Sequence, residues 1–101
     1  MSKQVTNMER ETKTIETPVG KNKLVIYTYL LGGDKRRLIS EPDPIKSQNI
    51  AINALVVSID EKTENHIKSI EEMHGKDFDF VTIELAKVMN ESSWDEDKKK
   101  E

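Results

Sequence analysis

The two histidines and one pair of acidic residues are the side chains best suited to metal binding or proton transfer. His66 and His74 are the only histidines in the 101 residues, and their spacing does not match that of zinc-binding helices. Asp77 and Asp79 flank Phe78, and paired carboxylates can share a proton or a cation. Residues two apart at a helix start point in different directions, which favours helix capping instead. We therefore expect surface histidines and no metal site.

A glycine-rich segment, Gly32-Gly33-Asp34-Lys35, has the composition of a phosphate-binding loop. It lacks the GxxxxGK[ST] spacing, and it follows a predicted hairpin instead of the strand of a βαβ unit. We expect a strand-to-helix turn, in which glycine supplies a positive φ angle and Asp34 caps the following helix.

Two tyrosines and three basic residues could form a surface for single-stranded nucleic acid. Tyr27 and Tyr29 would stack on bases, and the run Lys35, Arg36 and Arg37 would contact phosphates. The net charge of −3 gives no broad attraction to phosphate backbones, and hairpin tyrosines commonly pack within their own domain. Nucleic acid binding is therefore the alternative and not the preferred interpretation.

The composition argues against an enzyme. The chain has no cysteine, which excludes disulfides, a thiolate nucleophile and cysteine-based metal sites. No motif pairs a serine or threonine with a base, so we expect no catalytic residues and no cofactor. The longest strongly apolar run, Ala54 to Val57, is far too short for a signal peptide or a membrane span. We expect a cytoplasmic protein with no membrane partner.

Hydrophobic periodicity predicts one small α+β domain over residues 12–89, with a flexible lead at 1–11 and a disordered charged tail at 90–101. The domain should begin with a β-hairpin at about 12–30, because two β-rich runs flank a cluster of proline, glycine and asparagine. Three to four helices should follow and pack on it, at about 34–40, 44–59, 63–74 and 77–89.

The segment 44–59 carries one apolar stripe at helical spacing, made of Ile52, Leu55, Val56 and Ile59. Its β-branched content makes a buried strand the competing prediction. We favour a helix, because Asp43 supplies an N-cap and Pro44 suits the first helical position.

Three stretches carry a family resemblance. They are VIYTYLLGGDKRRLIS at 25–40, NALVVSID at 53–60 and MHGKDFDFVTIELAKV at 73–88. The first resembles a strand that runs into a Tyr-Leu-x-Gly-x-x-Lys-Arg-x-Leu helix start, with Gly33 in slightly shifted register, and the third resembles a helix-opening acidic–aromatic motif. Together these stretches resemble the small tail assembly chaperones of long-tailed bacteriophages, over roughly residues 12–89.

The resemblance implies a non-catalytic protein that binds the tape-measure protein, keeps its apolar helices soluble and recruits tail-tube subunits. It implies action in the host cytoplasm and absence from the mature virion, and it leaves a homo-oligomer open. The candidate partner contacts are Tyr27, Tyr29, Lys35, Arg36, Arg37 and Phe80. A virion structural subunit, such as a head–tail joining protein, stays as a further alternative. Members of the family often have a second, longer product made by ribosomal frameshifting. The resemblance implies that the run Lys98 to Lys100 is encoded by the slippery site. The alternative is that these lysines are a plain charged terminus.

Overall fold

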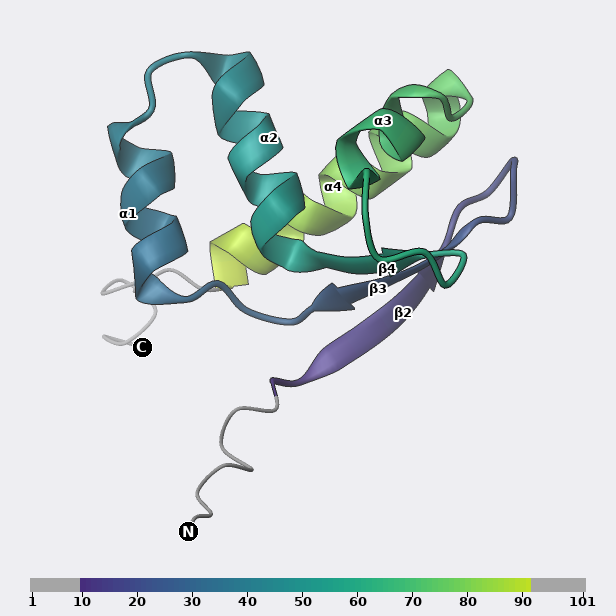
Figure 1. Ribbon diagram of the computed structural model, residues 1–101, viewed down its shortest axis with the longest axis horizontal. Helices are drawn as coiled ribbons and strands as arrows, with labels where there is room; N and C mark the ends of the chain where they lie inside the picture. Colours follow the sequence, from purple (N-terminus) through teal and green to yellow (C-terminus); the bar gives the residue numbers. More distant parts are fainter. Residues whose placement is uncertain (1–9, 92–101) are drawn as a thin grey trace, which may run out of the picture.

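The computed structural model describes residues 10–91, which form an antiparallel sheet with helices on one side (Figure 1). The strands are β2 (Thr12–Glu16), β3 (Lys23–Tyr27) and β4 (Val56–Ile59), and the helices are α1 (Gly32–Ser40), α2 (Pro44–Leu55), α3 (His66–Glu71) and α4 (Gly75–Glu91). The predicted α+β class is confirmed. Residues 1–9 and 92–101, which include most of the predicted lead and tail and the lysine run, lie outside the described part.

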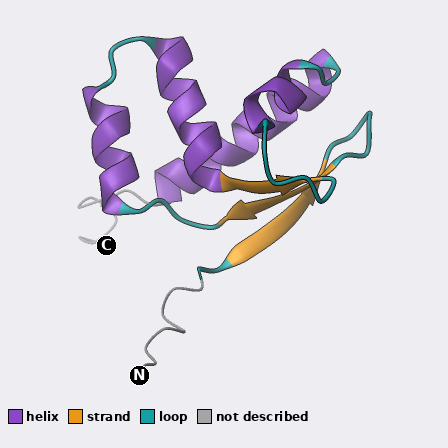
Figure 2. Cartoon of the chain, in the orientation of Figure 1, coloured by secondary structure: helices purple, strands orange, loops and turns teal. Residues whose placement is uncertain are grey.

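Strand β3 is the centre of the sheet and pairs antiparallel with β2 on one side and β4 on the other (Figure 2). The β2–β3 register pairs Thr12 with Tyr27 at one end and Glu16 with Lys23 at the other. Because side chains alternate along a strand, one set of β3 residues, including Leu24, turns toward the helices and is fully buried. The sheet therefore contributes one apolar face to the core.

The predicted helix over 44–59 is wrong at its C-terminal end, because α2 stops at Leu55 and β4 begins at the next residue. Three of the four residues of β4 are β-branched, which favours a strand. Pairing with β3 satisfies their backbone groups while Val56 and Ile59 stay buried. The apolar stripe was therefore correctly assigned to the core, although it is shared between a helix and a strand.

Two of the predicted aspartate caps, Asp43 and Asp34, differ in outcome. Asp43 is the N-cap of α2, and its carboxylate accepts two first-turn backbone N–H groups, at 2.8 and 3.4 Å. Asp34 does not cap α1, because the helix already begins at Gly32 and the Asp34 carboxylate pairs with Arg37 within the first turns. No glycine among residues 10–91 has a positive φ, so that part of the prediction for Gly32 and Gly33 is also wrong.

The third helix is shorter than the predicted 63–74. A backbone pairing between Ile59 and Lys62, with N···O distances of 2.9 Å in both directions, and the left-handed conformation of Asn65 delay its start. Residue His66, expected on the surface, is buried with its ring near the Lys62 carbonyl. Gly75 begins α4 and does not end α3.

Helix α4 supplies the other side of the core. Its buried stripe consists of Val81, Leu85 and Val88. These residues belong to one apolar cluster with strand and helix residues that include Leu24, Ile26, Leu55 and Ile70. A helix packed across a three-stranded sheet removes this apolar surface from water, which is the main stabilising contribution in a domain of this size.

Candidate functional site

The buried carboxylate of Asp77 is the first candidate for chemistry, because its side chain is only 1% exposed. Asp77 lies in the first turn of α4, opposite the turn that joins β2 to β3. Its Oδ1 accepts the backbone N–H of Val19 at 2.8 Å, and its Oδ2 accepts that of Gly20 at 2.7 Å. The carboxylate therefore binds a hairpin turn that is almost sixty residues away in the sequence.

The environment of Asp77 keeps the carboxylate ionised. Burial raises its pKa, but the N–H groups of Val19 and Gly20, with smaller help from the Thr17 hydroxyl and from His74, outweigh burial and leave the pKa below its ordinary value. A general base needs a pKa near the working pH and access to a substrate proton. Asp77 has neither, so it is a structural clamp and not a catalytic group.

A second carboxylate continues this network toward β4. Asp60 accepts the backbone N–H of Lys23 at 2.9 Å and the side-chain amide of Asn22 at 2.7 Å. These two hydrogen bonds, the one from Lys23 first, lower the pKa of Asp60. The Asn22 backbone N–H in turn binds the Thr17 hydroxyl at 2.9 Å. The hairpin turn is thus fixed by α4 through Asp77 and by the end of β4 through Asp60.

Among residues 10–91 no group of three or more histidine or acidic side chains lies close enough together to hold a metal ion. No helix in the same range is both long and apolar enough to cross a membrane.

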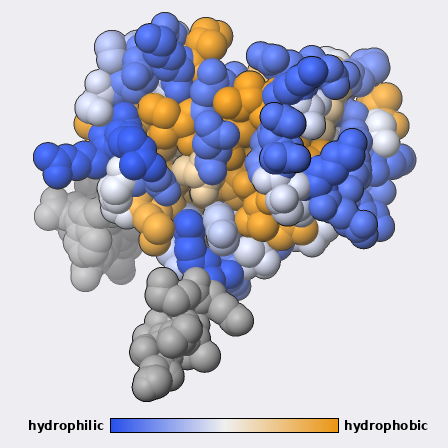
Figure 3. Space-filling view, in the orientation of Figure 1, coloured by the Kyte–Doolittle hydropathy of each residue, from blue (hydrophilic) through white to orange (hydrophobic). Residues whose placement is uncertain are grey.

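The α1–α2 hairpin carries apolar side chains with no cover in the described structure. None of the nine described residues of α1 is buried, and Ile39 and Ile45 are 77% and 66% exposed. Apolar atoms emerge between α1 and α2 within a hydrophilic surround (Figure 3). Between this hairpin and α4 lies a groove of about 280 Å³, here called the helix groove, lined by Leu38, Pro44, Ser47, Gln48, Ala51, Thr82, Leu85, Ala86 and Met89.

The two predicted tyrosine contacts lie together, beyond the helix groove. Tyr27 is half-buried at the end of β3, and Tyr29 follows two residues later with 39% of its surface exposed. The guanidinium of Arg10 covers both, at 3.8 Å from the centroid of the Tyr27 ring and 4.9 Å from that of Tyr29. The resident arginine occupies these ring faces, so stacking with nucleic acid bases would require its displacement.

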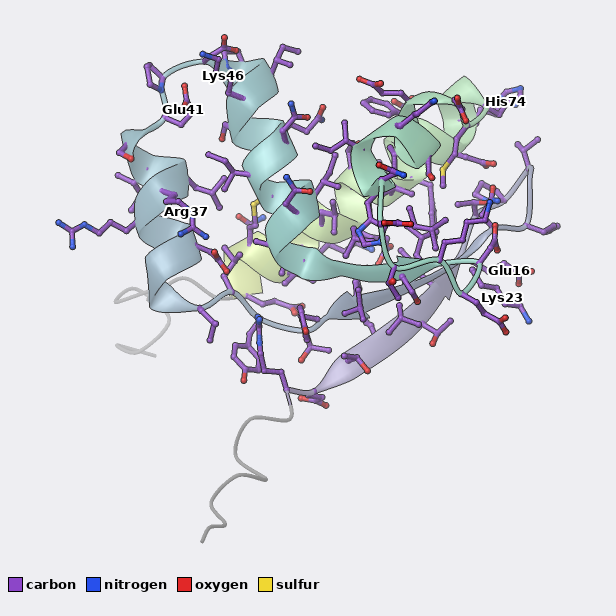
Figure 4. All side chains as sticks on the ribbon, in the orientation of Figure 1. Glu16, Lys23, Arg37, Glu41, Lys46 and His74 are labelled. Carbon is purple, nitrogen blue, oxygen red and sulfur yellow. The ribbon has the colours of Figure 1, made fainter. Side chains whose placement is uncertain are left out.

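The predicted basic contacts and the phenylalanine lie on two other elements. Lys35, Arg36 and Arg37 are on α1, where Arg37 pairs with Asp34, while the charged residues Glu41 and Lys46 mark the tip of the α1–α2 hairpin (Figure 4). Phe80 is half-buried and packs against the apolar core from α4. The structure therefore does not bring the six predicted contacts into one site.

Ile39, Ile45 and Arg10 were not predicted from the sequence as surface or contact residues. An isoleucine at each side of the break Pro42-Asp43-Pro44 was a usable signal, because a helix as short as α1 cannot bury a full apolar stripe. The contact of Arg10 with the tyrosines had no such signal, since it depends on how the chain enters β2.

Replacing Asp77 with asparagine should weaken the dependence of stability on acid. The folded pKa of Asp77 lies below 3.8, so the ionised carboxylate stabilises the fold above that pH, and this contribution declines as the pH falls below 3.8. Urea unfolding measured from neutral to acid pH should give Asp77→Asn a lower stability at neutral pH and a shallower loss in acid. The variant should still lose some stability in acid, because the pKa of Asp60 is also lowered. The control is Asp79→Asn, which replaces an exposed carboxylate. An acid slope equal to that of the unmutated chain would contradict the clamp.

Replacing Gly20 with alanine should destabilise the fold by about 1–3 kcal/mol through overpacking. A Cβ there would lie 2.7 Å from Asn22 Oδ1 and 3.0 Å from Asp77 Oδ2, and both side chains are held by other hydrogen bonds. Gly33→Ala is the matched control, because a Cβ at Gly33 meets nothing within 4 Å and alanine should stabilise a helix by about 0.5–1 kcal/mol. Chemical denaturation of both variants measures the difference, and equal effects would refute the close approach at Gly20.

Comparison with protein-family models, with curated proteins and with solved structures finds no match to this chain.

Proposed function

We propose that this chain is a protein-binding assembly factor of the phage tail chaperone class, which holds apolar helices of the tape-measure protein. The observation that carries the proposal is the exposed apolar surface of the α1–α2 hairpin beside the helix groove. None of the described residues of α1 is buried, so its apolar side chains would gain burial from a partner. Residues 25–40, which resemble the family's strand-to-helix segment, include α1 of this hairpin, and this supports the proposal.

The helix groove suits a partner helix better than a small molecule. Its volume of about 280 Å³ is at the small end of the range of about 300–1,000 Å³ typical of ligand pockets. The small side chains Ser47, Ala51 and Ala86 allow another backbone to approach, and the unbranched Met89 can adapt to different side chains. Apolar residues spaced at i, i+3 or i+4 on a partner helix would enter the groove while Ile39 and Ile45 cover their flanks.

The charges around this surface suit a holding factor. Arg36 and Lys46 are exposed on the same hairpin, and charged residues beside an apolar patch keep the free protein from self-associating. The same proposal has the factor recruit tail-tube subunits while the tape-measure protein is held, in the host cytoplasm, and then leave before the virion is complete.

The double substitution Ile39→Glu with Ile45→Glu should abolish holding without unfolding the domain, because both side chains are exposed. The chain is co-expressed with a tape-measure fragment encoded in the same genome, and the soluble share of the fragment is measured. We expect the unmutated chain and the control Ile83→Glu, which replaces an isoleucine 55% exposed outside the helix groove, to raise that share several-fold. The double variant should not raise it.

Two results would overturn this proposal. One is a fragment that precipitates equally with and without the unmutated chain. The other is a chain found at stoichiometric amounts in purified particles, which would identify a virion subunit. The nucleic acid alternative has its own signature. If the chain binds nucleic acid, and that affinity falls steeply between about 50 and 200 mM salt, phosphate binding is indicated, because it releases counterions.

A further inference from the structure

Arg10 is held where the chain enters the sheet, by groups that recognise a guanidinium. The central carbon of its guanidinium, Cζ, lies 3.8 Å from the ring centroid of Tyr27 and 4.9 Å from that of Tyr29. One terminal nitrogen donates a hydrogen bond to the Tyr29 carbonyl at 2.5 Å. The ring faces attract the cation and the carbonyl accepts one of its protons. We call the two rings and this carbonyl the tyrosine site.

The resident arginine fits this site imperfectly. No acidic side chain within residues 10–91 forms a salt bridge with Arg10. Its Nε is buried in the described structure and has no hydrogen-bond acceptor there. A buried donor without an acceptor lowers the stability of the contact. A guanidinium that arrives free to choose its orientation would avoid this cost.

Arg10 can leave without dismantling the sheet. It precedes the first residue of β2, and the backbone pairing next to it is the bond from the Thr28 N–H to the Glu11 carbonyl, at 3.1 Å. The five residue pairs that join β2 to β3 all lie beyond this point. Release of Arg10 would therefore uncover the two tyrosine rings and leave the β2–β3 pairing intact.

An adjoining hollow has room for the rest of a ligand. Tyr27 also lines a hollow of about 900 Å³ between β4 and α3. Two carboxylates, those of Glu64 and Glu71, and one cation, that of Lys68, line it as well. The surplus of negative charge favours a basic segment over an acidic one.

We propose that the tyrosine site binds an arginine side chain of a protein partner and that Arg10 is its built-in competitor. The site is separate from the helix groove and goes beyond the proposed holding function. Binding exchanges one guanidinium for another, so the partner's arginine displaces Arg10 from the two rings. The partner's neighbouring residues then occupy the hollow beside Tyr27.

The chain has two tyrosines and both belong to the site, so their ring resonances report binding directly. We would titrate Arg10→Ala and the unmutated chain with acetyl-arginine-amide and follow these signals by NMR. Arg10→Ala should show saturable shifts, and the unmutated chain should bind about ten-fold more weakly, because its site is already occupied. Acetyl-lysine-amide should bind Arg10→Ala more weakly, because lysine lacks the planar fork.

Three controls make the result decisive. Adding Tyr27→Leu to Arg10→Ala should abolish the saturable shift of Tyr29, and circular dichroism should show that both variants stay folded. Adding Ile39→Glu and Ile45→Glu to Arg10→Ala should leave its affinity for acetyl-arginine-amide unchanged. That result would separate this site from the helix groove. No saturable shift in folded Arg10→Ala, or equal affinity for the arginine and lysine probes, would overturn the proposal.

Discussion

The carboxylate of Asp77 joins helix α4 to the β2–β3 hairpin. It lies on α4 and binds the backbone of the β2–β3 turn through two N–H groups, while Asp60 holds the neighbouring end of the same turn. A charge buried to this extent is stable only when it is fully hydrogen-bonded. The helix and the hairpin therefore have one relative position in which Asp77 is satisfied. This contact fixes the start of α4 beside the hairpin turn, and the apolar stripe of the same helix packs in the core.

The domain combines a fixed part with a loosely attached part. The sheet, α4 and the turn share buried apolar and polar contacts, whereas α1 is held without any buried residue of its own among those described. Elements with little burial open at a lower free energy than the core. An element of this kind can adapt to a partner at small cost, and the clamped sheet supplies the rigid base from which it acts.

The sequence was sufficient wherever a local rule decided the structure. Asp43 before Pro44 predicted the start of α2, and the helical spacing of residues such as Ile52 and Leu55 predicted burial. The α-to-β change after Leu55 was not predictable from periodicity, because the free edge of β3 determined it. The role of Asp77 was hidden for the same reason: its partners at Val19 and Gly20 are close only in the folded chain. Local patterns gave the aspartate a capping role that the tertiary structure replaced.

Amide hydrogen exchange, read residue by residue, tests the clamped arrangement most directly. We expect the N–H groups of Val19 and Gly20, although in an exposed turn, to exchange as slowly as core strand amides such as that of Ile26. We also expect the amides of α1 to exchange much faster than those of α4. Turn amides that exchange at the rate of an unstructured peptide, or an α1 as protected as α4, would contradict it.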